Sequence, residues 1–428
     1  MRNNTSWLQH IPKHWEIMRL KDVCELNPNP TDENIIGTVS FVPMESLRYD
    51  CITPMSIDYN EARGKYTYFC NEDLLIAKVT PCFENGNVAI AKDLMQGVGF
   101  GTSEIFVLRN NEKIKNRFLF YVVRTNAFIG QACSTMYGVG GLKRISPLFM
   151  RTALIPLPPL SEQEKIARYL DTKVGEIDQK VSLIEKKIER YQLLKKSIIN
   201  KVVTKGLHPE ASLKESQISW LGQIPEHWEV KRIKDIISLV FMGTSPSYEY
   251  EVENENYVFG QRNNQLYKID FNGLKHATNE FFSSRSEYEY LTYGDVIINT
   301  LGGGSVGRVG YFDYLGDMRM ITDGHVMILR SNSYSTKFLY YYLHSKRREL
   351  ENLASGSTNQ SFFNISDIVV LYLPAPPLSE QQEIASYLDQ KCADIDAIIA
   401  NCTAQIEKYK TLKRALINEV VTGQRTIE

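Results

Sequence analysis

The sequence predicts an α+β protein in which an α/β domain followed by a long helix occurs twice in tandem. The stretch PPLSEQEKIARYLD at 158–171 returns as PPLSEQQEIASYLD at 376–389, with eleven of the fourteen positions identical. WLQHIPKHWEIMRLKDV at 7–23 likewise returns as WLGQIPEHWEVKRIKDI at 220–236. The two pairs have nearly the same offset, so the 428 residues divide into two repeats, each long enough for its own core.

The two middle regions share a faint pattern of strands and one short helix. Short apolar runs with β-branched residues, bounded by polar positions, predict buried strands. Because the loops between these runs differ, the duplicated scaffold indicates two related binding tasks on two different targets. The strand pairs are DLLIAK at 73–78 with DVIINT at 295–300, and FVLR at 106–109 with MILR at 327–330; the helix pair is FLFY at 118–121 with FLYY at 338–341.

Each PPLSEQ stretch predicts the start of a helix of roughly 43 residues, or about 65 Å. The prolines just before the helix end the preceding element of secondary structure. Capping boxes are predicted at Ser161 with Glu164 and at Ser379 with Gln382, since the serine can accept from the backbone while the longer side chain reaches back.

A heptad seam runs along both predicted helices, with apolar residues at steps of three and four. Neither helix can leave such a seam in water, so we expect the two to pack together. Tandem copies usually associate about a two-fold axis, which makes the helices antiparallel; a bundle inside one compact domain is the alternative. The predicted packing residues are Leu170, Val174, Ile177, Val181, Ile184, Ile188, Tyr191, Leu388, Ile395, Ile399, Ile406 and Tyr409; the seam continues to Leu194 and Leu412, Cys392 and Cys402 are expected to be small core residues, and Gly206 and Gly423 to end the helices.

The composition is that of a globular protein: 43% of residues are hydrophobic and 23% are charged. No apolar run approaches the roughly 18–20 residues of a membrane helix, and the first residues resemble no export signal. The seven cysteines are scattered without a CxxC pair, which favours a cytoplasmic location over a disulfide frame or a zinc site. With a net charge of −1, attraction to nucleic acid would have to come from local patches or from another subunit.

Several loops carry the side chains that read or hold DNA. In GQRNNQ at 260–265, arginine can pair with guanine, and asparagine or glutamine with adenine. The glycine-rich GGGSVGR at 302–308 allows close approach to a phosphate chain, and a basic pair lies in GGLKRIS at 140–146. A tight turn or an ordinary polar surface loop is the alternative for each. The candidate DNA-binding residues are Gln261, Arg262, Asn263, Asn264, Gly303, Ser305, Arg308, Lys143, Arg144, Lys78, Asn359 and Gln360.

No catalytic set is recognisable in the sequence. GGGSVGR lacks the Gly-Lys-Ser/Thr ending of a nucleotide-binding P-loop, and the seven histidines show no metal-ligand spacing. NPNP at 27–30 lacks the second consecutive proline and the aromatic residue of adenine methyltransferases. We therefore expect a non-catalytic protein without a metal or a cofactor of its own.

Five stretches together resemble the specificity subunit of type I restriction–modification systems. They are SWLGQIPEHWEV at 219–230, LPPLSEQ at 157–163 with its second copy APPLSEQ at 375–381, VVTKG at 202–206 and PCFENG at 81–86, and the resemblance covers nearly the whole chain. It implies two target recognition domains, at 1–157 and 207–373, and two conserved helices, at 158–206 and 374–428. Each recognition domain would read one half of a split double-stranded DNA site.

The resemblance also implies the partners. These would be two modification subunits, which methylate adenine, and restriction subunits with ATP-driven motors; S-adenosylmethionine, ATP and magnesium would belong to those partners, and no membrane is involved. In one respect the repeats differ: the first helix has more Lys and Arg than Asp and Glu, whereas the second has fewer. A coiled-coil adaptor that binds two copies of a protein and no nucleic acid is the alternative function. The sequence does not reveal the DNA target or the spacer length.

Overall fold

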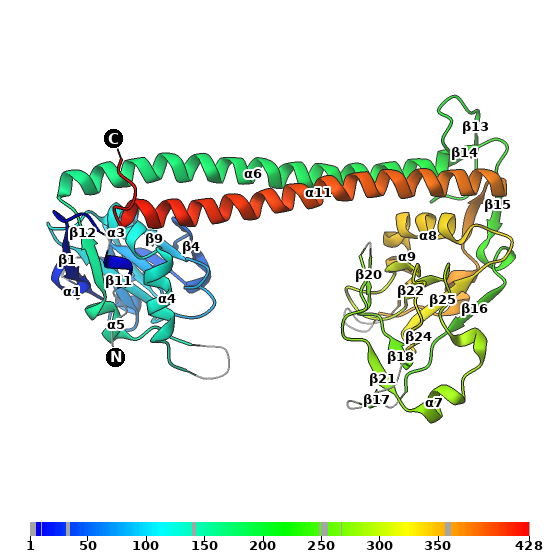
Figure 1. Cartoon of the computed structure of the whole chain (residues 1–428), viewed down its shortest axis with the longest axis horizontal. Coiled ribbons are helices and arrows are strands. Elements are labelled where there is room, and N and C mark those ends of the chain that lie inside the picture. Colours follow the sequence, from blue (N-terminus) through cyan, green and yellow to red (C-terminus); the bar gives the residue numbers. More distant parts are fainter. Residues whose placement is uncertain are drawn as a thin grey trace. The chain divides into compact units, whose positions relative to one another are not determined.

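The computed structural model describes residues 6–9, 11–30, 35–138, 143–246, 248–249, 256–266, 268–355 and 361–427 (Figure 1). The chain forms two compact units, Met1–Glu185 with Cys402–Glu428, and Lys186–Asn401, and each contains part of both long helices. The predicted fold class is confirmed: two α/β domains in a tandem pseudo-repeat, with two long helices in an antiparallel coiled coil. No helix among the described residues is long and apolar enough to cross a membrane.

The first unit is built on two four-stranded sheets. One has the order β2-β11-β8-β9 and the other β6-β3-β10-β7, in which β3 and β10 are parallel. Their strands are β2 (Cys24–Leu26), β11 (Ile105–Asn110), β8 (Leu74–Ala77), β9 (Val88–Ile90), β6 (Met55–Asp58), β3 (Thr38–Val42), β10 (Val98–Gly101) and β7 (Thr67–Cys70). Around them lie the ladders β1 (Glu16–Arg19) with β12 (Leu154–Leu157) and β4 (Leu47–Arg48) with β5 (Cys51–Ile52), and the helices α1 (Leu20–Val23), α2 (Tyr59–Ala62), α3 (Asn116–Val122), α4 (Asn126–Ser134) and α5 (Pro147–Thr152).

The second unit repeats this plan. Its sheets have the orders β16-β25-β22-β23 and β17-β21-β18-β24, with β18 parallel to β24. The strands are β16 (Leu239–Met242), β25 (Val326–Arg330), β22 (Val296–Asn299), β23 (Val309–Tyr311), β17 (Tyr248–Glu249), β21 (Lys275–Ala277), β18 (Asn256–Phe259) and β24 (Arg319–Thr322). The ladders are β15 (Glu229–Arg232) with β26 (Tyr372–Ala375), β13 (Leu213–Glu215) with β14 (Gln223–Pro225), and β19 (Asn264–Gln265) with β20 (Lys268–Ile269); the helices are α7 (Asn279–Ser283), α8 (Thr336–Ser345), α9 (Arg347–Leu353) and α10 (Ile365–Val369).

The faint sequence pattern of the middle regions marks the same elements in both units. All four residues of β8 and of β22 are buried, as their continuous apolar runs predict, and FLFY and FLYY lie in α3 and α8. An ion pair between an aspartate and an arginine also occurs at the equivalent place in both units. Asp73 pairs with Arg109 at 2.7 Å, and Asp295 pairs with Arg330 at 2.7 Å. Both carboxylates are buried, so the arginine supplies the partner that a buried charge requires.

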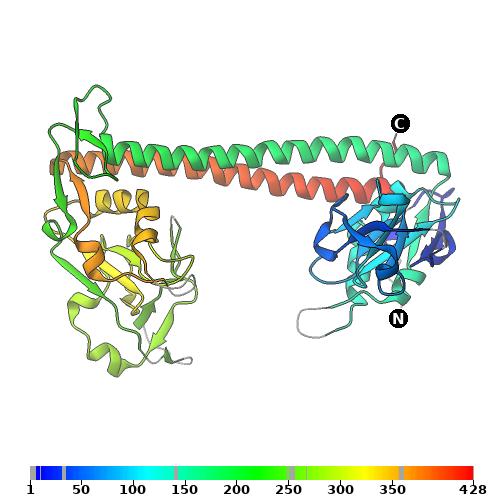
Figure 2. The same ribbon diagram turned by 180° about the vertical axis from the view of Figure 1, so that it is seen from behind.

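The two long helices are α6 (Leu160–Lys205) and α11 (Leu378–Val421), of 46 and 44 residues. Figures 1 and 2 show them side by side. They end where glycine allows a positive φ, +73° at Gly206 and +69° at Gly423. The predicted capping boxes are wrong, because each helix begins one residue before its serine. Glu164, predicted to reach back to the cap, pairs instead with Lys115 at 2.7 Å.

The Ser-Glu-Gln stretch that opens each long helix, at 161–163 and 379–381, is called the SEQ motif here. It forms no capping box but has another role, which is the same in both units. The first glutamate of each motif receives the indole N–H of a tryptophan, Trp15 to Glu162 at 2.9 Å and Trp228 to Glu380 at 3.0 Å. The glycine that ends the other long helix closes over the same tryptophan, since a Cβ on Gly423 would lie 3.2 Å from Trp15. The duplicated tryptophan segments therefore join the start of one long helix to the end of the other within each unit.

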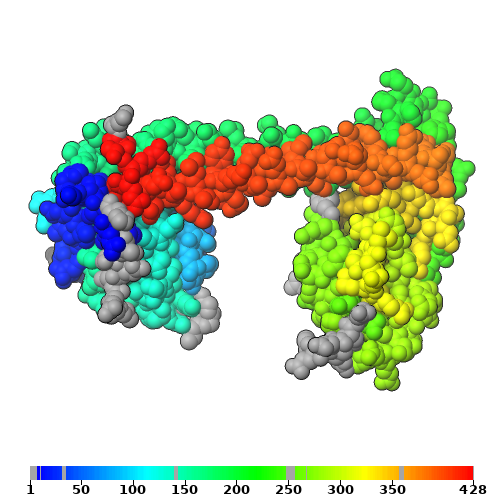
Figure 3. Space-filling model, viewed as in Figure 1, coloured from blue at the N-terminus to red at the C-terminus, as the bar shows by residue number. Residues whose placement is uncertain are grey.

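The seam is formed by most of the predicted packing residues. Leu170, Val174, Ile177, Leu388, Ile395 and Ile406 are buried, as are Cys392 and Cys402, whereas Val181, Ile184, Ile188, Tyr191, Ile399 and Tyr409 are half-buried. The prediction is wrong at Leu194 and Leu412, which are 46% and 51% exposed. At those turns a neighbouring lysine packs instead: Lys195 pairs with Asp396, and Lys413 with Asp178, both at 2.7 Å. In Figure 3 much of α11, orange to red, is open to solvent.

Each α/β domain is also fixed to a long helix by a tyrosine. The Tyr121 hydroxyl donates to Asp171 at 2.7 Å, and the Tyr341 hydroxyl donates to Asp389 at 2.6 Å. Each carboxylate also pairs with a cation: Asp171 with Arg117 in the first unit, and Asp389 with Lys337 in the second. Burial and these carboxylates raise the pKa of both tyrosines, so the hydroxyls remain donors at neutral pH.

Candidate nucleic-acid interface

Two loops predicted to contact DNA lie against each other in the second unit. The Oγ of Ser305, in the glycine-rich loop, lies 3.0 Å from Oε1 of Gln261 in GQRNNQ. The backbone carbonyl of Gln261 accepts from the Asn299 amide at 3.0 Å. Gly303, at the tip of the glycine-rich loop, is exposed. The structure thus brings together two stretches that are about 40 residues apart in the sequence.

Asn263 and Asn264 do not face the solvent, which argues against the predicted base contacts. They are 2% and 0% exposed. The Asn263 amide donates to the carbonyl of Asp270 at 2.8 Å, and the Asn264 amide donates to Oδ1 of Asn299 at 3.0 Å. Asn264 also packs so closely on Gly310 that a Cβ there would meet it at 2.3 Å. Both NH₂ groups thus hold the loop in shape, whereas Oδ1 of Asn264 has no hydrogen-bond partner among the described residues.

Arg262 is the exposed member of this loop. Its guanidinium lies along Gly273, where a Cβ would approach Nη2 to 3.2 Å. Its backbone carbonyl accepts from the side chain of Gln265, so the backbone is held while the side chain extends over the surface. Such a residue can present a guanidinium to a base edge or to a phosphate.

Arg308 supports the loops and also carries charge to their surface. Nη1 donates to the carbonyl of Asn264 at 3.1 Å, and Nη2 donates to the carbonyl of Gly304 at 3.2 Å. Burial lowers the pKa of Arg308, and the nearby charge of Arg347 lowers it further. Arg347 was missed in the sequence, where the run KRRE at 346–349 was the signal that could have indicated it.

In the first unit the predicted cations also come together. The carbonyl of Lys78 accepts from the backbone N–H of Ile145, and the N–H of Lys143 donates to Oγ1 of Thr80, so Lys78, Lys143 and Arg144 lie on adjacent segments. Lys143 is exposed, and Lys78 lies with Nζ 5.2 Å from the centre of the Phe106 ring. The arrangement presents two lysines at the end of β8.

Arg144 differs from its lysine neighbours because it already has a partner. Its guanidinium donates to Glu104, with Nη2 at 2.6 Å from Oε1, and this hydrogen bond and the carboxylate charge raise its pKa. A phosphate would have to compete with that carboxylate. Asn359 and Gln360 lie outside the described residues; the described Phe362 forms a β-bridge with Leu301, directly before the glycine-rich loop.

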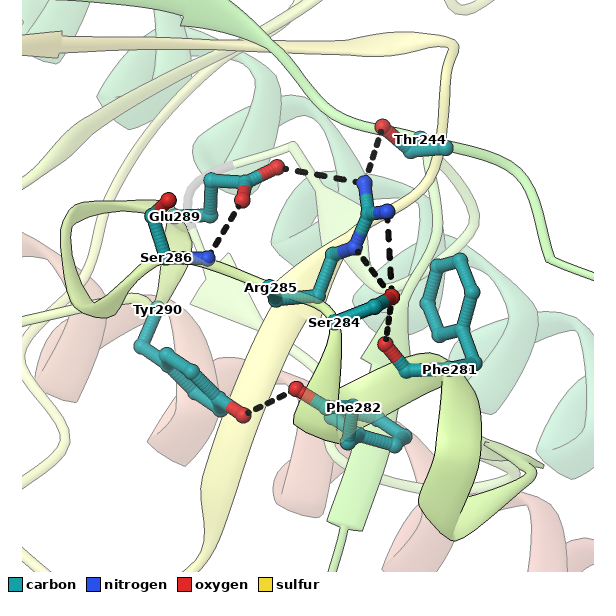
Figure 4. A network of polar contacts seen from close by, with 8 residues as sticks. All are labelled: Thr244, Phe281, Phe282, Ser284, Arg285, Ser286, Glu289 and Tyr290. Carbon is teal, nitrogen blue, oxygen red and sulfur yellow. Dashed lines mark hydrogen bonds and ion pairs between the residues drawn. The ribbon is translucent and has the colours of Figure 1, made fainter.

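The far end of the second domain has a polar network that sequence analysis missed (Figure 4). Arg285 contacts Oγ1 of Thr244 at 3.4 Å and Oε1 of Glu289 at 3.5 Å, and its guanidinium lies 4.9 Å from the centre of the Phe281 ring. Glu289 also accepts from the N–H of Ser286 at 2.7 Å. These contacts hold the turn after α7 in place, so Arg285 stabilises the conformation of this part of the domain.

Neither unit shows a metal centre among its described residues, since no group of three or more His, Cys, Asp or Glu side chains there could hold an ion. The arrangement instead presents loops with guanidinium, ammonium and amide groups on rigid sheets. Such surfaces bind polyanions and hydrogen-bonding edges.

Comparisons with known proteins agree with this arrangement. A family model described as the type I restriction modification DNA specificity domain matches residues 12–190 and 225–408. The putative type I restriction enzyme MjaX specificity subunit of Methanocaldococcus jannaschii is 26% identical, over 97% of this chain and 94% of that protein. The EcoAI specificity subunit of Escherichia coli is 31% identical, over 51% of this chain and 37% of that protein.

Two solved structures share the fold. A chain from a study of complex assembly and conformational transition of the type I R-M system gives a TM-score of 0.75 at 21% identity, covering 97% of this chain and 99% of that one. The HsdS subunit from Thermoanaerobacter tengcongensis gives a TM-score of 0.55 at 21% identity, covering 97% and 98%. Both similarities extend over the two α/β domains and the long helices.

Proposed function

This chain belongs to the type I restriction–modification DNA specificity family, and we propose that it reads a two-part double-stranded DNA site, one part with each α/β domain. The observation that carries this proposal is the duplication. Two copies of one scaffold, each matched by the family model, present loops of different sequence. A repeated scaffold with different loops serves two different targets of one kind. The family match gives no support to the alternative of an adaptor that binds protein alone.

The proposal includes its partners. The chain would hold two modification subunits, and restriction subunits in the nuclease form, on the DNA. It is the non-catalytic specificity subunit and would bind no cofactor; S-adenosylmethionine, ATP and magnesium would act in the partners. Its net charge of −1 supports this division, because a chain without excess positive charge needs partners to complete a DNA clamp. The cytoplasm is the compartment in which all of these components and the DNA meet.

The test is binding of the chain, assembled with its modification subunits, to a pool of random-sequence duplexes. Repeated selection by gel shift should enrich one sequence of two short fixed parts separated by a spacer of fixed length. Adenines methylated by the same complex should lie within the fixed parts. Enrichment of no sequence, at salt concentrations where the complex is intact, would contradict the proposal.

A further inference from the structure

We propose that Arg308 and Arg347 form one clamp for a single DNA backbone phosphate beside the glycine-rich loop of the second α/β domain. The inference rests on the proposed function, because the ligand is a phosphodiester of the DNA that the chain would read. It goes beyond that function by assigning a phosphate contact to a helix, α9, that carries none of the residues predicted from the sequence.

Both arginines of the proposed clamp donate to the same backbone carbonyl group. The Nη2 atoms of Arg308 and Arg347 lie 3.2 Å and 3.3 Å from the carbonyl oxygen of Gly304. The two arginines come from different elements: one directly precedes β23, and the other begins α9. Two guanidinium groups repel each other, so holding both at one neutral oxygen costs free energy unless an anion joins them.

The charge of the pair is only partly neutralised by the protein. Arg347 pairs with Glu351 at 2.8 Å, whereas Arg308 takes part in none of the ion pairs found in the described parts of the chain. The buried Nε of Arg308 also lacks a hydrogen-bond partner there. One carboxylate for two guanidiniums leaves a net positive charge at the loop. A phosphodiester supplies one negative charge and two oxygens that match the fork of a guanidinium.

The surroundings are also cationic. Arg347 lines a groove of the second unit together with Lys196 of α6 and His344 of α8. The pKa of His344 is lowered to about 4, first by its burial and then by Lys195, Arg347 and Lys196. At neutral pH the histidine is therefore uncharged, and the groove is lined by three cations, Lys196, Arg347 and Arg348, against one carboxylate, Glu351. Gly303 and Gly304 are exposed, and no backbone carbonyl among the described residues accepts from their N–H groups; a backbone N–H in such a loop can donate to an anion.

Among the described residues of the first domain, no two arginines meet at the equivalent place. The bridge of Val79 with Arg144 corresponds to that of Leu301 with Phe362, which aligns the turn at 80–86 with the glycine-rich loop. That turn carries a carboxylate, Glu84, which contacts Sγ of Cys133 at 4.0 Å. We therefore expect the phosphate contact in only one half of the DNA site.

The first test measures how salt weakens binding of the assembled complex to a duplex with its selected site. A phosphate contact contributes roughly 0.9 to the slope of log K against log salt. Arg347→Ala and Arg308→Ala should each reduce the slope by about one and weaken binding about tenfold or more, equally on selected and random duplexes. The matched control is Arg232→Ala, which removes a half-buried arginine of the same unit that is paired with Asp235, and it should change neither quantity.

The second test identifies the phosphate. Duplexes with one neutral methylphosphonate linkage at a time are scanned through both half-sites. At one position, in the half read by the second domain, the neutral linkage should weaken the unaltered complex as much as Arg347→Ala does, and it should not weaken that variant further. Arg347→Ala is the decisive variant because Arg308 also supports the loop.

Two outcomes would overturn the clamp. One is an unchanged salt slope for a folded Arg347→Ala complex, and the other is a methylphosphonate scan with no position that removes the effect of the variant. If the unaltered complex bound no duplex at all, the proposed function would fail, and the clamp with it. Failure of the clamp alone leaves specific binding intact, so the two failures are distinguishable.

Discussion

At the scale of single residues, burial separates the predicted DNA-binding side chains that face the solvent from those that pack inside the domain. In GQRNNQ, composition alone gave arginine and both asparagines equal claims as base readers. The structure turns the two asparagine amides inward, where they satisfy backbone and side-chain groups, and leaves Arg262 exposed. A polar side chain in a loop can either contact a ligand or hold the loop in shape, and its surroundings in the fold decide between these two roles.

Arg262→Ala tests the residue that remains available. If Arg262 contacts a base edge with both nitrogens, its loss should cost about 1–3 kcal/mol on the selected site and far less on random duplexes. Competition binding with the two duplexes measures the difference. An equal loss on both would make Arg262 a phosphate contact, and no loss would remove it from the interface.

A second prediction at this scale concerns His344. Its folded pKa of about 4 lies below the ordinary value of 6.5, so the unfolded chain binds more protons between these values. The stability that depends on a neutral His344 is therefore fully present above pH 6.5 and is lost as the pH falls toward 4, by about 2–3 kcal/mol. Urea unfolding of the full chain from pH 7 to 4.5 should be less pH-dependent in His344→Gln. The same pH dependence in the variant would contradict this assignment.

At the scale of elements, the coiled coil keeps its seam through most of its length but replaces apolar contacts with ion pairs at two related turns. The heptad pattern predicted Leu194 and Leu412 at the seam. Each is followed by a lysine whose long stem packs between the helices and whose ammonium reaches an aspartate of the other helix. Periodicity cannot distinguish these two neighbours, since both lie near the inner face.

The Lys195–Asp396 pair has a testable cost. The Lys195 side chain is only 7% exposed, whereas that of Asp396 is 55% exposed and partly screened by water. Asp396→Ala removes a carboxylate that pairs with a buried lysine and should destabilise the protein by about 1–3 kcal/mol. Lys195→Met keeps the packing without the charge and should cost less than about 1.5 kcal/mol.

Urea unfolding of the full chain measures both variants, and the related pair, Lys413 with Asp178, is the matched comparison. The Lys413 side chain is more exposed, at 16%, so Asp178→Ala should cost less than Asp396→Ala. A larger cost for Lys195→Met than for Asp396→Ala would show that packing of the stem, and not the charge, dominates this contact.

At the scale of the whole molecule, the length of the coiled coil is expected to set the spacer between the two parts of the DNA site. Inserting four residues after Ile184 lengthens α6 by about 6 Å, or roughly one to two base pairs at 3.4 Å each. Four residues are close to one turn, so the apolar face remains nearly in phase. The two fixed parts of the site should not change, because no recognition loop is altered.

Methylation of duplexes that differ only in spacer length measures this prediction. Inserting two residues at the same position is the control, since it rotates the seam away from its partner and should reduce stability. A four-residue variant that remains folded and active with its original spacer would show that the helices join the subunits without measuring the site.

The sequence by itself determined the duplication, the two long helices with their ends at Gly206 and Gly423, the antiparallel pairing and the family. All of these depend on periodicity and repeated motifs, which can be recognised directly from the order of the residues. Only the tertiary structure decided why the SEQ motif is kept, with Glu162 and Glu380 receiving tryptophan N–H groups, and which loop residues face outward. It alone brought Arg347 to Arg308 across 39 positions of sequence. Buried polar groups must find partners wherever the fold places them, and that requirement joins residues that no spacing in the sequence relates.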